Sequence, residues 1–336
     1  IGQGETTAAC AKDGVDRGDA SRGRGTKGMM FQNRRGVAQG VECPQGSWGA
    51  KCPRCSVTLT YHKQGGRMQC HVCGYSSTAP AVCPKCGTPS PRMLGLGTEK
   101  VEEETATLFP DARILRLDRD TATSTSHYEH TVPDFERGAA DILVGTQMIT
   151  KGFDFPVLEL VGILNADNML NFPDFRASER AYQTMTQVAG RAGRSGPDGE
   201  VVIQTSQPDH PVIRQVQTLD YEGMVNMQLA ERSIFGYPPY GRLIKIIMRH
   251  RDERLLNETA AWLAARTREL FGNRVFGPHA PLIEKAGGES FMEIMLKIEN
   301  GTSAAKVKEG LAKIISAASR HANYKRVTVF CDIDPQ

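Results

Sequence analysis

Seven of the nine cysteines lie between Cys43 and Cys86, and six of these seven form C-x-x-C pairs. A C-x-x-C turn places two thiolates on one side of a tight loop, each about 2.3 Å from a shared zinc ion. Two such pairs complete a closed tetrahedral site with no position left for a catalytic water. The spacing therefore predicts a structural zinc ion on the first two pairs, which are Cys52 and Cys55, and Cys70 and Cys73.

The third pair, Cys83 and Cys86, has an incomplete partner. Cys43 is the nearest remaining cysteine, and Gly46 stands where a second thiol would complete its pair. A second site would thus be one ligand short, and zinc held by three cysteines and water would bind more weakly. Two histidines are candidates for a replacement ligand, although loop histidines are more often simply solvated: His62 and His71. We expect one or two zinc ions per chain.

Two further segments could bind phosphate groups. Residues 145–156 read GTQMITKGFDFP and follow an apolar strand, where α/β sheets expose functional loops. Residues 187–194 read QVAGRAGR and end a helix, and the two arginines stand three apart among small residues. Such arginines can fork onto phosphate oxygens and stabilise a transferring phosphoryl group. A basic helix end that merely complements the helix dipole is the alternative. The presence of both segments favours the phosphate function.

The surrounding pattern predicts the elements that position these segments. Apolar segments alternate between strand and helix from residue 97 onward, which is typical of a parallel α/β layer. Strands are expected at 29–31, 113–117, 141–145, 158–164 and 200–204, and helices at 98–108, 127–137, 176–189 and 210–230. After the YPPYG break at 237–241, the order becomes β-α-β-β-α-β, which predicts a small α+β domain. Its strands are expected at 243–248, 282–285, 291–298 and 326–333, and its helices at 253–271 and 303–322.

Composition limits the class of protein. The chain has 336 residues, a net charge of +3 and 40% hydrophobic residues, so two or three folded domains are expected and global disorder is excluded. No apolar run reaches the roughly 18–20 residues of a membrane span. The chain length and the C-x-x-C pairs disfavour a secreted disulfide scaffold. Residues 1–28 show no periodicity, and we expect them to be disordered or aberrant sequence.

Several segments together resemble one family. Residues 145–156 and 187–194 resemble motifs V and VI of superfamily 2 helicases. A cysteine-rich insertion between FQNRRG and GLGTE makes the resemblance specific to the PriA family of bacterial replication-restart helicases, also called primosomal protein N′. The resemblance covers about residues 29–335 and includes MMFQNRRG, KCPRC, GLGTEKVEEE, LDRDT, ILVGTQMITKGFDFP, FRASERAYQ, QVAGRAGR, YPPYGRL and DIDP.

The resemblance implies an α/β fold. A RecA-like helicase C-terminal lobe with an inserted cysteine-rich zinc segment would be followed by a small α+β C-terminal domain. The implied division is residues 1–28 as the aberrant segment, 29–208 as the second helicase lobe with its zinc insertion at 43–90, 209–240 as a helical linker, and 241–336 as a domain that binds DNA and partner proteins.

Site roles also follow from the resemblance. Arg191 and Arg194, with Gln187 and Gly190, would reach the ATP phosphates. A second group would contact the DNA backbone or couple it to ATP: Thr146, Gln147, Lys151, Gly152 and Asp154. In the family the zinc sites interleave, so that Cys43, Cys83 and Cys86 form the outer, incomplete site. The expected partners are forked or single-stranded DNA, single-strand-binding protein and other primosome proteins, in the cytoplasm at the nucleoid and without a membrane.

The family's activity is ATP-dependent DNA unwinding, 3′ to 5′, which needs two lobes with ATP and Mg²⁺ between them. This sequence contains no Gly-Lys dipeptide and hence no phosphate loop, so we expect the chain alone to lack ATPase activity. A frameshift or fragmentary gene would explain residues 1–28 and the missing lobe. Two alternatives are a non-enzymatic zinc-containing module that binds fork DNA or primosome proteins, and an inactive truncated product.

Overall fold

The structure is a computed structural model, and it describes residues 27–33, 40–42, 50, 53, 59–62, 67–69, 76–87, 92–94, 98–118, 133–150, 158–170, 172, 174–193, 199–205, 207–281 and 283–335. The chain divides into two compact units. The first comprises residues 1–38 and 95–228, and the second comprises residues 39–94 and 229–336. Each unit is described by itself.

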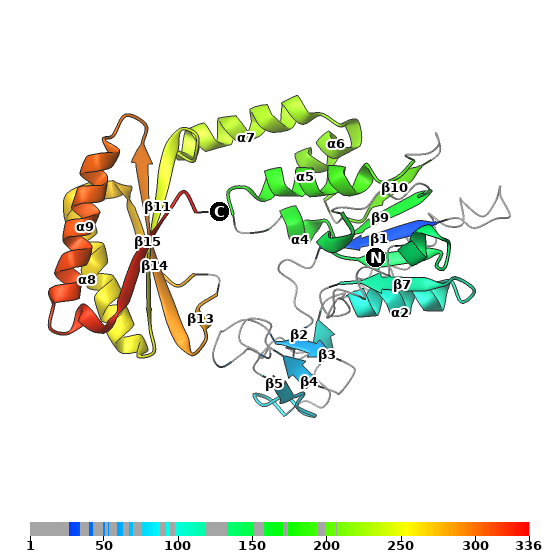
Figure 1. The fold of residues 1–336 in the computed structure, drawn as a ribbon, viewed down its shortest axis with the longest axis horizontal. Helices are drawn as coiled ribbons and strands as arrows, with labels where there is room; N and C mark the ends of the chain where they lie inside the picture. The colour runs from blue at the N-terminus through cyan, green and yellow to red at the C-terminus, as the bar shows by residue number, and fades with distance from the viewer. Residues whose placement is uncertain are drawn as a thin grey trace. The chain divides into compact units, whose positions relative to one another are not determined.

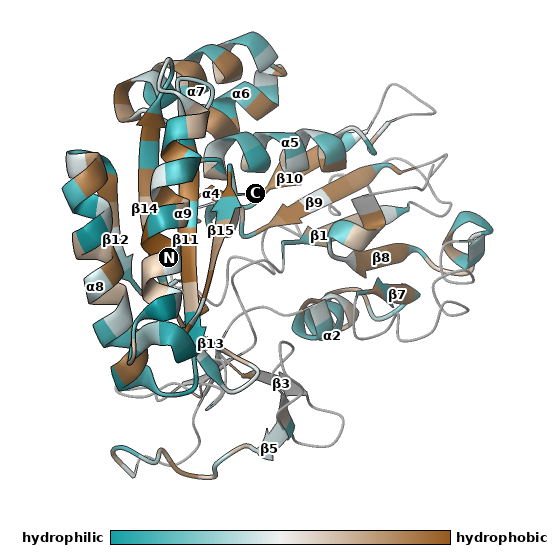
Figure 2. Cartoon of the chain, turned by 60° about the vertical axis from the view of Figure 1, so that its left-hand side comes forward, coloured by the Kyte–Doolittle hydropathy of each residue, from teal (hydrophilic) through white to brown (hydrophobic). Residues whose placement is uncertain are grey.

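A five-stranded parallel sheet forms the centre of the first unit. Its strands are β1 (Gly28–Gln32), β7 (Ile114–Leu117), β8 (Ile142–Gly145), β9 (Leu160–Leu164) and β10 (Glu200–Ile203). They lie in the order β10-β9-β1-β8-β7, so β1 is the central strand although the cysteine segment separates it from the others in sequence (Figure 1). Strands covered on both faces carry apolar residues in succession, as the brown colour of β8 and β9 shows (Figure 2).

Helices cover this sheet and complete its core. They are α2 (Thr98–Leu108), the 3-10 helix η1 (Gln147–Thr150), α4 (Asp167–Leu170), α5 (Ala177–Ala189), α6 (Pro211–Thr218) and α7 (Tyr221–Phe235). Phe31, Leu143 and Met185 lie in the larger core cluster, and Val101 of α2 packs with Met30 and Val144 in a second cluster. The expected RecA-like lobe is confirmed.

The expected single helix over 210–230 is wrong, because the chain forms two helices there. Leu219 ends α6 with a left-handed backbone, φ 54°, and is 69% exposed. Asp220 then accepts a hydrogen bond from the Gly223 amide through its side chain, at 2.8 Å, in the first turn of α7. An aspartate that binds a nearby amide favours a new helix start over continuation of the old helix. In the helix expected at 127–137, residues 133–136 are helical and residues 127–132 lie outside the described part of the chain.

The cysteine segment forms small antiparallel ribbons. β2 (Gly40–Glu42) pairs with β6 (Arg92–Leu94). The strands β3 (Thr60–His62), β4 (Arg67–Gln69) and β5 (Ser76–Thr78) form a three-stranded sheet in sequence order. Strands this short have little apolar surface to bury, which fits a segment that depends on metal for its stability.

The C-terminal part is the expected α+β domain with one change of strand. Its elements are β11 (Gly241–His250), α8 (Glu253–Phe271), β12 (Val275–His279), β13 (Lys285–Ala286), β14 (Glu289–Glu299), α9 (Ala304–Arg320) and β15 (Thr328–Ile333). The sheet order is β12-β14-β11-β15. The strand expected at 282–285 is therefore misplaced, because β12 is the sheet partner and only the two residues of β13 continue the hairpin with β14.

Candidate nucleotide and nucleic-acid sites

Polar residues gather where the parallel strands end. Thr146 directly follows β8, and the strand register pairs its neighbour Gly145 with Phe31 and Leu117. Gln32 therefore lies on one side of Thr146 at this edge, and Asp118, which follows β7, lies on the other. The Thr98 hydroxyl at the start of α2 donates a hydrogen bond to the Asp118 carboxylate. The carboxyl edge of the sheet thus carries Thr146 among buried polar side chains.

The backbone at Gly145 allows no side chain. A Cβ atom there would lie 2.6 Å from the Leu117 carbonyl oxygen and 2.5 Å from Cγ2 of Ile149. Only glycine permits this close approach of β8, β7 and η1. Gly145 therefore determines where Thr146 and Gln147 leave the sheet.

The carboxyl edge continues across β9 and β10 with residues that the sequence reasoning missed. The Asn165 amide donates to Oε1 of Gln204 at 3.1 Å, and the Thr205 hydroxyl donates to Oδ1 of Asp167. Asn165 adopts φ 50°, a left-handed conformation that asparagine tolerates better than most residues. Asn165 directly follows one expected strand, and Gln204 is the last residue of another. Their position at strand ends is the sequence signal that could have identified them.

Arg191 lies at the opposite, amino edge of the same sheet. The Gly193 amide donates to the Leu158 carbonyl oxygen at 3.0 Å, and Leu158 precedes β9 by two residues. Gly190 ends α5, Gln187 is exposed in its last turn, and Arg191 is buried to 8% exposure. Residues 187–193 are thus at the edge of the sheet where the strands begin, and Thr146 is at the edge where they end.

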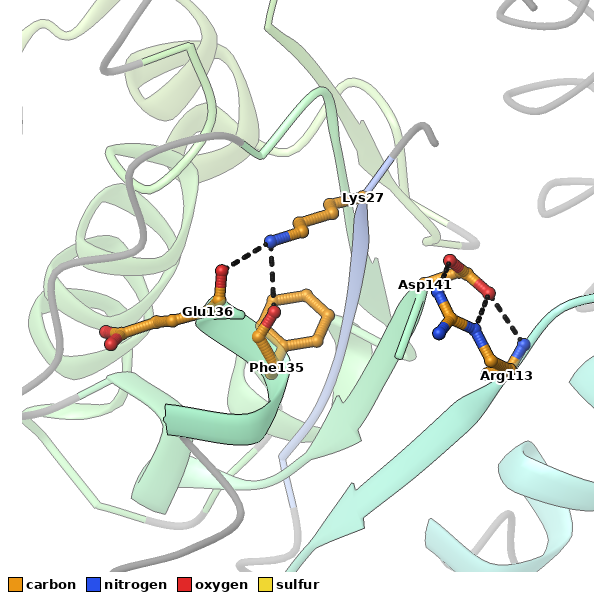
Figure 3. A network of polar contacts seen from close by, with 5 residues as sticks. All are labelled: Lys27, Arg113, Phe135, Glu136 and Asp141. Atoms are coloured by element: carbon orange, nitrogen blue, oxygen red, sulfur yellow. Dashed lines mark hydrogen bonds and ion pairs between the residues drawn. The ribbon is translucent and has the colours of Figure 1, made fainter. Parts of the chain in front are cut away.

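The amino edge is held together by charged side chains (Figure 3). The Lys27 ammonium donates to the carbonyl oxygens of Phe135 and Glu136, both at 3.0 Å. Arg113 donates to the Asp141 carboxylate from its backbone amide, Nε and Nη2 at 2.9, 3.0 and 2.8 Å. These Arg113 hydrogen bonds hold the pKa of Asp141 below its ordinary value of 3.8. The contacts fix the starts of β1, β7 and β8 relative to one another.

The other residues of the two motifs lie outside the described part of the chain: Lys151, Gly152, Asp154 and Arg194. The described residues on either side define the ends of the connecting segment. It leaves η1 after Thr150 and returns at Leu158. Residues 151–157 therefore connect the carboxyl edge at β8 to the amino edge at β9.

The third cysteine pair forms a tight turn. The Gly87 amide donates to the Cys83 carbonyl oxygen at 2.9 Å, and Gly87 has φ 72°, a left-handed conformation that favours glycine. Cys83 is buried to 1% exposure and Cys86 is exposed. The other five cysteine candidates, Cys43, Cys52, Cys55, Cys70 and Cys73, lie outside the described residues. Within the described residues, no three metal-binding side chains gather.

The first two cysteine pairs are attached to one end of a hairpin. Thr60 pairs with Gln69, whereas His62 pairs with Arg67 at the other end. Cys70 directly follows Gln69, and Cys55 precedes Thr60 by five residues. The strand register therefore brings the two attachment points together, which fits one zinc ion bound by both pairs.

Three family models match consecutive parts of the chain. The "PriA DNA helicase Cys-rich region (CRR) domain" matches residues 52–77, the "Helicase conserved C-terminal domain" matches 96–196, and the "Primosomal protein N C-terminal domain" matches 233–336. The Replication restart protein PriA of Bacillus subtilis is 36% identical over 314 residues, which are 93% of this chain and 39% of that protein. This chain belongs to the PriA family.

Other PriA proteins give the same result. The PriA protein of Treponema pallidum is 41% identical over 285 residues, which are 84% of this chain and 43% of that protein. The PriA protein of Haemophilus influenzae is 36% identical over 327 residues, which are 96% of this chain and 44% of that protein. The chain corresponds to the C-terminal part of these PriA proteins and spans less than half their length. Domain 2 of the DEAD-box helicase Mss116p is similar over 65% of this chain and 57% of that structure, at 15% identity and a TM-score of 0.35.

The match to the Cys-rich region model indicates zinc binding by the segment at residues 52–77. The thiols of the C-x-x-C pairs are donors that zinc prefers, and the register that pairs Thr60 with Gln69 is compatible with one ion held by the first two pairs. Among the described residues, no helix is both long enough and apolar enough to cross a membrane.

Proposed function

We propose that this chain contributes the second motor lobe and the fork-binding part of a replication-restart helicase. ATP-dependent unwinding, 3′ to 5′, belongs to the protein in which a first lobe is also present. One observation carries the proposal: Thr146 and Arg191 occupy opposite edges of a single parallel sheet. One lobe can therefore contact a nucleic-acid strand at one edge and a nucleotide at the other.

The ATP side of the proposal rests on the amino edge. Arg191 and Arg194 bind the ATP phosphates, and Gln187 and Gly190 complete this end of α5. Arginines positioned in this way stabilise the charge of a transferring phosphoryl group. The hydrogen bond from the Gly193 amide to Leu158 holds the loop that carries Arg191, and this supports a defined position for its backbone. ATP and Mg²⁺ bind only when a second lobe supplies the phosphate loop.

The DNA side rests on the carboxyl edge. Thr146 and Gln147 contact the phosphate backbone with neutral donors, which position a strand without reading its sequence. Lys151, Gly152 and Asp154 carry the chain from this edge to the ATP edge and couple the two sites. The connection between β8 and β9 supports this assignment, because its ends lie at opposite edges of the sheet.

Zinc stabilises the inserted segment and does not take part in catalysis. A closed thiolate site supplies folding energy by holding distant parts of the chain together. We assign the inner site to Cys52, Cys55, Cys70 and Cys73, and the outer site to Cys43, Cys83 and Cys86. The proposed chain division keeps this insertion at 43–90 within the lobe at 29–208, with a linker at 209–240 and a DNA-binding and partner-binding domain at 241–336.

The proposed partners are forked or single-stranded DNA, single-strand-binding protein and other primosome proteins, at the nucleoid in the cytoplasm. A non-enzymatic fork-binding module is the second candidate. The charge distribution favours it: residues 241–336 contain 16 Lys and Arg against 11 Asp and Glu, a net charge of +5, whereas the whole chain has +3. An excess of cations in one domain attracts a polyanion such as DNA.

The two candidates are separated by one experiment with two readouts. The chain itself is expected to bind a labelled DNA fork without hydrolysing ATP, and turnover that Arg194→Ala abolishes would contradict the two-lobe requirement.

Fusion of the N-terminal part of the Bacillus subtilis relative to residue 27 is expected to produce DNA-stimulated ATPase activity. Arg191→Ala should lower this activity about 1000-fold. Gln183→Ala, an exposed change on the same helix, is the control. A fusion that binds forks without ATPase activity supports the module instead.

A further inference from the structure

The net charge of the C-terminal domain comes from one segment. Residues 304–327, which form α9 and the turn after it, contain six Lys and Arg and one Glu, a net charge of +5. The remaining residues of 241–336 contain ten Lys and Arg and ten Asp and Glu, so their charges cancel. We call the exposed side chains of residues 304–327 the α9 surface. Its cations, all of them exposed, are Lys306, Lys308, Lys313, Arg320, Lys325 and Arg326.

Three of these cations stand in a row along α9. Val307 and Leu311 are buried in the core of the domain, where α8 and α9 cover one side of the sheet (Figure 1). Lys306, Lys313 and Arg320 follow one another at intervals of seven residues and are exposed. Seven residues are close to two helical turns, so the three side chains leave the same side of the helix over a length of about 21 Å.

Small side chains lie beside this row on the outer side of α9. Ala305, Ala312 and Ser316 are exposed there, and Lys308 stands on their other side. These positions follow from the turn of about 100° per residue in an α-helix. Short side chains between cations allow a rigid partner to approach the helix backbone closely.

Most cations of the α9 surface have no acidic partner. Lys313 Nζ lies 2.7 Å from Oε1 of Glu309, and Arg320 Nε donates to the Ser316 carbonyl oxygen at 3.1 Å. Among the described residues, none of the six cations except Lys313 has a carboxylate at ion-pair distance. The positive charge of this surface is therefore not neutralised within the part of the chain that the structure describes.

The stability of the helix does not explain the position of Lys306. This residue lies in the first turn of α9, which contains no acidic residue. The helix dipole is positive at this end and favours Asp or Glu, so a lysine there opposes the dipole. Arg320, in contrast, lies in the last turn and complements it. A partner of opposite charge accounts for cations at both ends of the same helix.

Three aromatic rings hold the end of α9. The His321 ring stacks on Tyr324 with ring centres 4.1 Å apart, and the Trp262 ring of α8 lies 5.8 and 5.5 Å from these two rings. All three side chains are half-buried. Their packing holds Arg320 and Lys325, which adjoin His321 and Tyr324 in sequence, near the end of the row. Rings that pack on one another offer no open platform for an unpaired base, so the α9 surface is suited to phosphate groups.

We propose that the α9 surface binds the phosphate backbone of duplex DNA, with Lys306, Lys313 and Arg320 along one strand. A duplex presents its phosphates in a regular array with one pair per 3.4 Å, so the row spans about six base pairs. Contacts of this kind hold a duplex without reading its sequence. The proposal rests on the proposed fork-binding role of this chain and assigns the residues that hold a duplex arm of the fork.

The test uses the full chain and a fluorescently labelled blunt-ended duplex at several salt concentrations. The triple variant Lys306→Gln, Lys313→Gln and Arg320→Gln is expected to weaken binding at least about tenfold, because it loses three phosphate contacts. Each lost contact lowers the slope of log affinity against log salt concentration by about 0.9, so the slope should fall by about 2.7. An unchanged slope would overturn the proposal.

A second triple variant separates the place of the charges from their number: Arg249→Gln, Arg254→Gln and Arg274→Gln. These arginines lie elsewhere in the same domain, and each pairs with a glutamate, at 3.4, 3.1 and 2.6 Å respectively. The variant removes the same net charge and should keep its duplex affinity within about threefold, with the slope unchanged. Equal losses in the two triple variants would show that only net charge matters and would refute the α9 surface.

Lys306→Glu distinguishes lost contacts from lost folding. A glutamate in the first turn complements the helix dipole, so the melting temperature should not fall. The reversed charge should nevertheless weaken duplex binding at least as much as Lys306→Gln does. If binding is lost only in variants whose melting temperature also falls, the loss belongs to folding and the proposal is overturned.

The outcomes separate this inference from the proposed function. If the chain binds no DNA of any form, both fail. If it binds forks and the first triple variant keeps its affinity for both fork and duplex, only the α9 surface is refuted. Loss of oligo(dT) binding or of decaglutamate binding, with duplex binding unchanged, would assign the surface to single strands or to an acidic protein segment, and either result overturns the proposal.

Discussion

The Gly193 amide donates a hydrogen bond to the Leu158 carbonyl oxygen at 3.0 Å, which fixes the arginine loop at the beginning of β9. Gly193 has φ 67°, and a side chain at Gly199 would lie 2.2 Å from the Gly193 amide nitrogen. The two glycines thus allow the backbone at Gly193 and at Gly199 to lie in close contact. This position places Arg191 at the amino edge of the sheet and Thr146 at its carboxyl edge, so the proposed nucleotide and nucleic-acid contacts lie at separate edges.

Gly145→Ala is expected to destabilise the first unit and weaken DNA binding. The new methyl group would overlap the Leu117 carbonyl oxygen, and relief of that overlap must move η1 and Thr146. Overpacking of this kind costs about 1–3 kcal/mol. The free energy of unfolding in urea and the affinity for fork DNA measure the two effects.

Gly162→Ala is the matched control, because it also lies in a buried strand but its Cβ would meet its nearest atoms at 3.9 Å, an ordinary contact. We expect it to change the unfolding free energy by less than about 1 kcal/mol. Equal effects of the two substitutions would show that the close approach at Gly145 is not the cause.

Leu219→Gly is expected to stabilise the chain, although it removes a large side chain. Leu219 is 69% exposed and adopts φ 54°, so little packing is lost and backbone strain is relieved. The left-handed conformation costs a non-glycine residue about 1–2 kcal/mol, and the greater freedom of glycine in the unfolded chain offsets part of this. A net gain of about 0.5–1 kcal/mol should appear in the unfolding free energy.

Thr218→Gly tests the same reasoning one residue earlier. Thr218 is the last residue of α6, so glycine there should destabilise by about 0.5 kcal/mol. If both glycine substitutions shift the unfolding free energy in the same direction, the left-handed conformation of Leu219 is not what separates α6 from α7.

Asp141→Asn is expected to lower stability at neutral pH and to have little effect in acid. The Arg113 hydrogen bonds hold the pKa of Asp141 below 3.8, so the folded state favours the ionised carboxylate. This stabilisation is fully present above the unfolded pKa and disappears as pH falls through the lower folded pKa. The difference in unfolding free energy between the two proteins should therefore be largest near pH 7 and shrink below about pH 4.

Asp134→Asn is the control for this pH dependence. Asp134 pairs with Arg137 three residues along the chain, and both side chains are largely exposed, at 45% and 69%. Such pairs contribute little at any pH. A pH-independent effect of Asp141→Asn would refute the assigned role of its ionised form.

Zinc content distinguishes the two predicted sites. Elemental analysis of reduced protein should find between one and two zinc ions per chain. Cys52→Ser should remove the tighter ion, and Cys83→Ser the weaker one. Cys331→Ser, on the edge strand β15, should leave the content unchanged. Complete absence of zinc in freshly purified protein would remove the assignment of both sites.

Periodicity and spacing were sufficient for most of the architecture. Apolar runs such as ILVG and LVGIL follow from burial on both faces of a parallel sheet, and glycine, proline and aspartate mark where elements end. The family resemblance came from short motifs such as QVAGRAGR and from the paired cysteines. These are local properties, because a strand, a cap or a C-x-x-C turn involves residues close together in the chain.

Long-range packing determined the rest. The central position of β1 depends on its pairing with β8 and β9 across the cysteine insertion, and no local pattern specifies that partner. The placement of Thr146 and Arg191 at opposite edges arises because α5 runs back along the sheet before Gly193 binds Leu158. The C-terminal sheet, with Phe276 and Phe330 on separate edge strands, exists only once four distant segments pair. Side chains far apart in sequence are brought to one surface by hydrogen-bond register and core burial, which are properties of the assembled sheet.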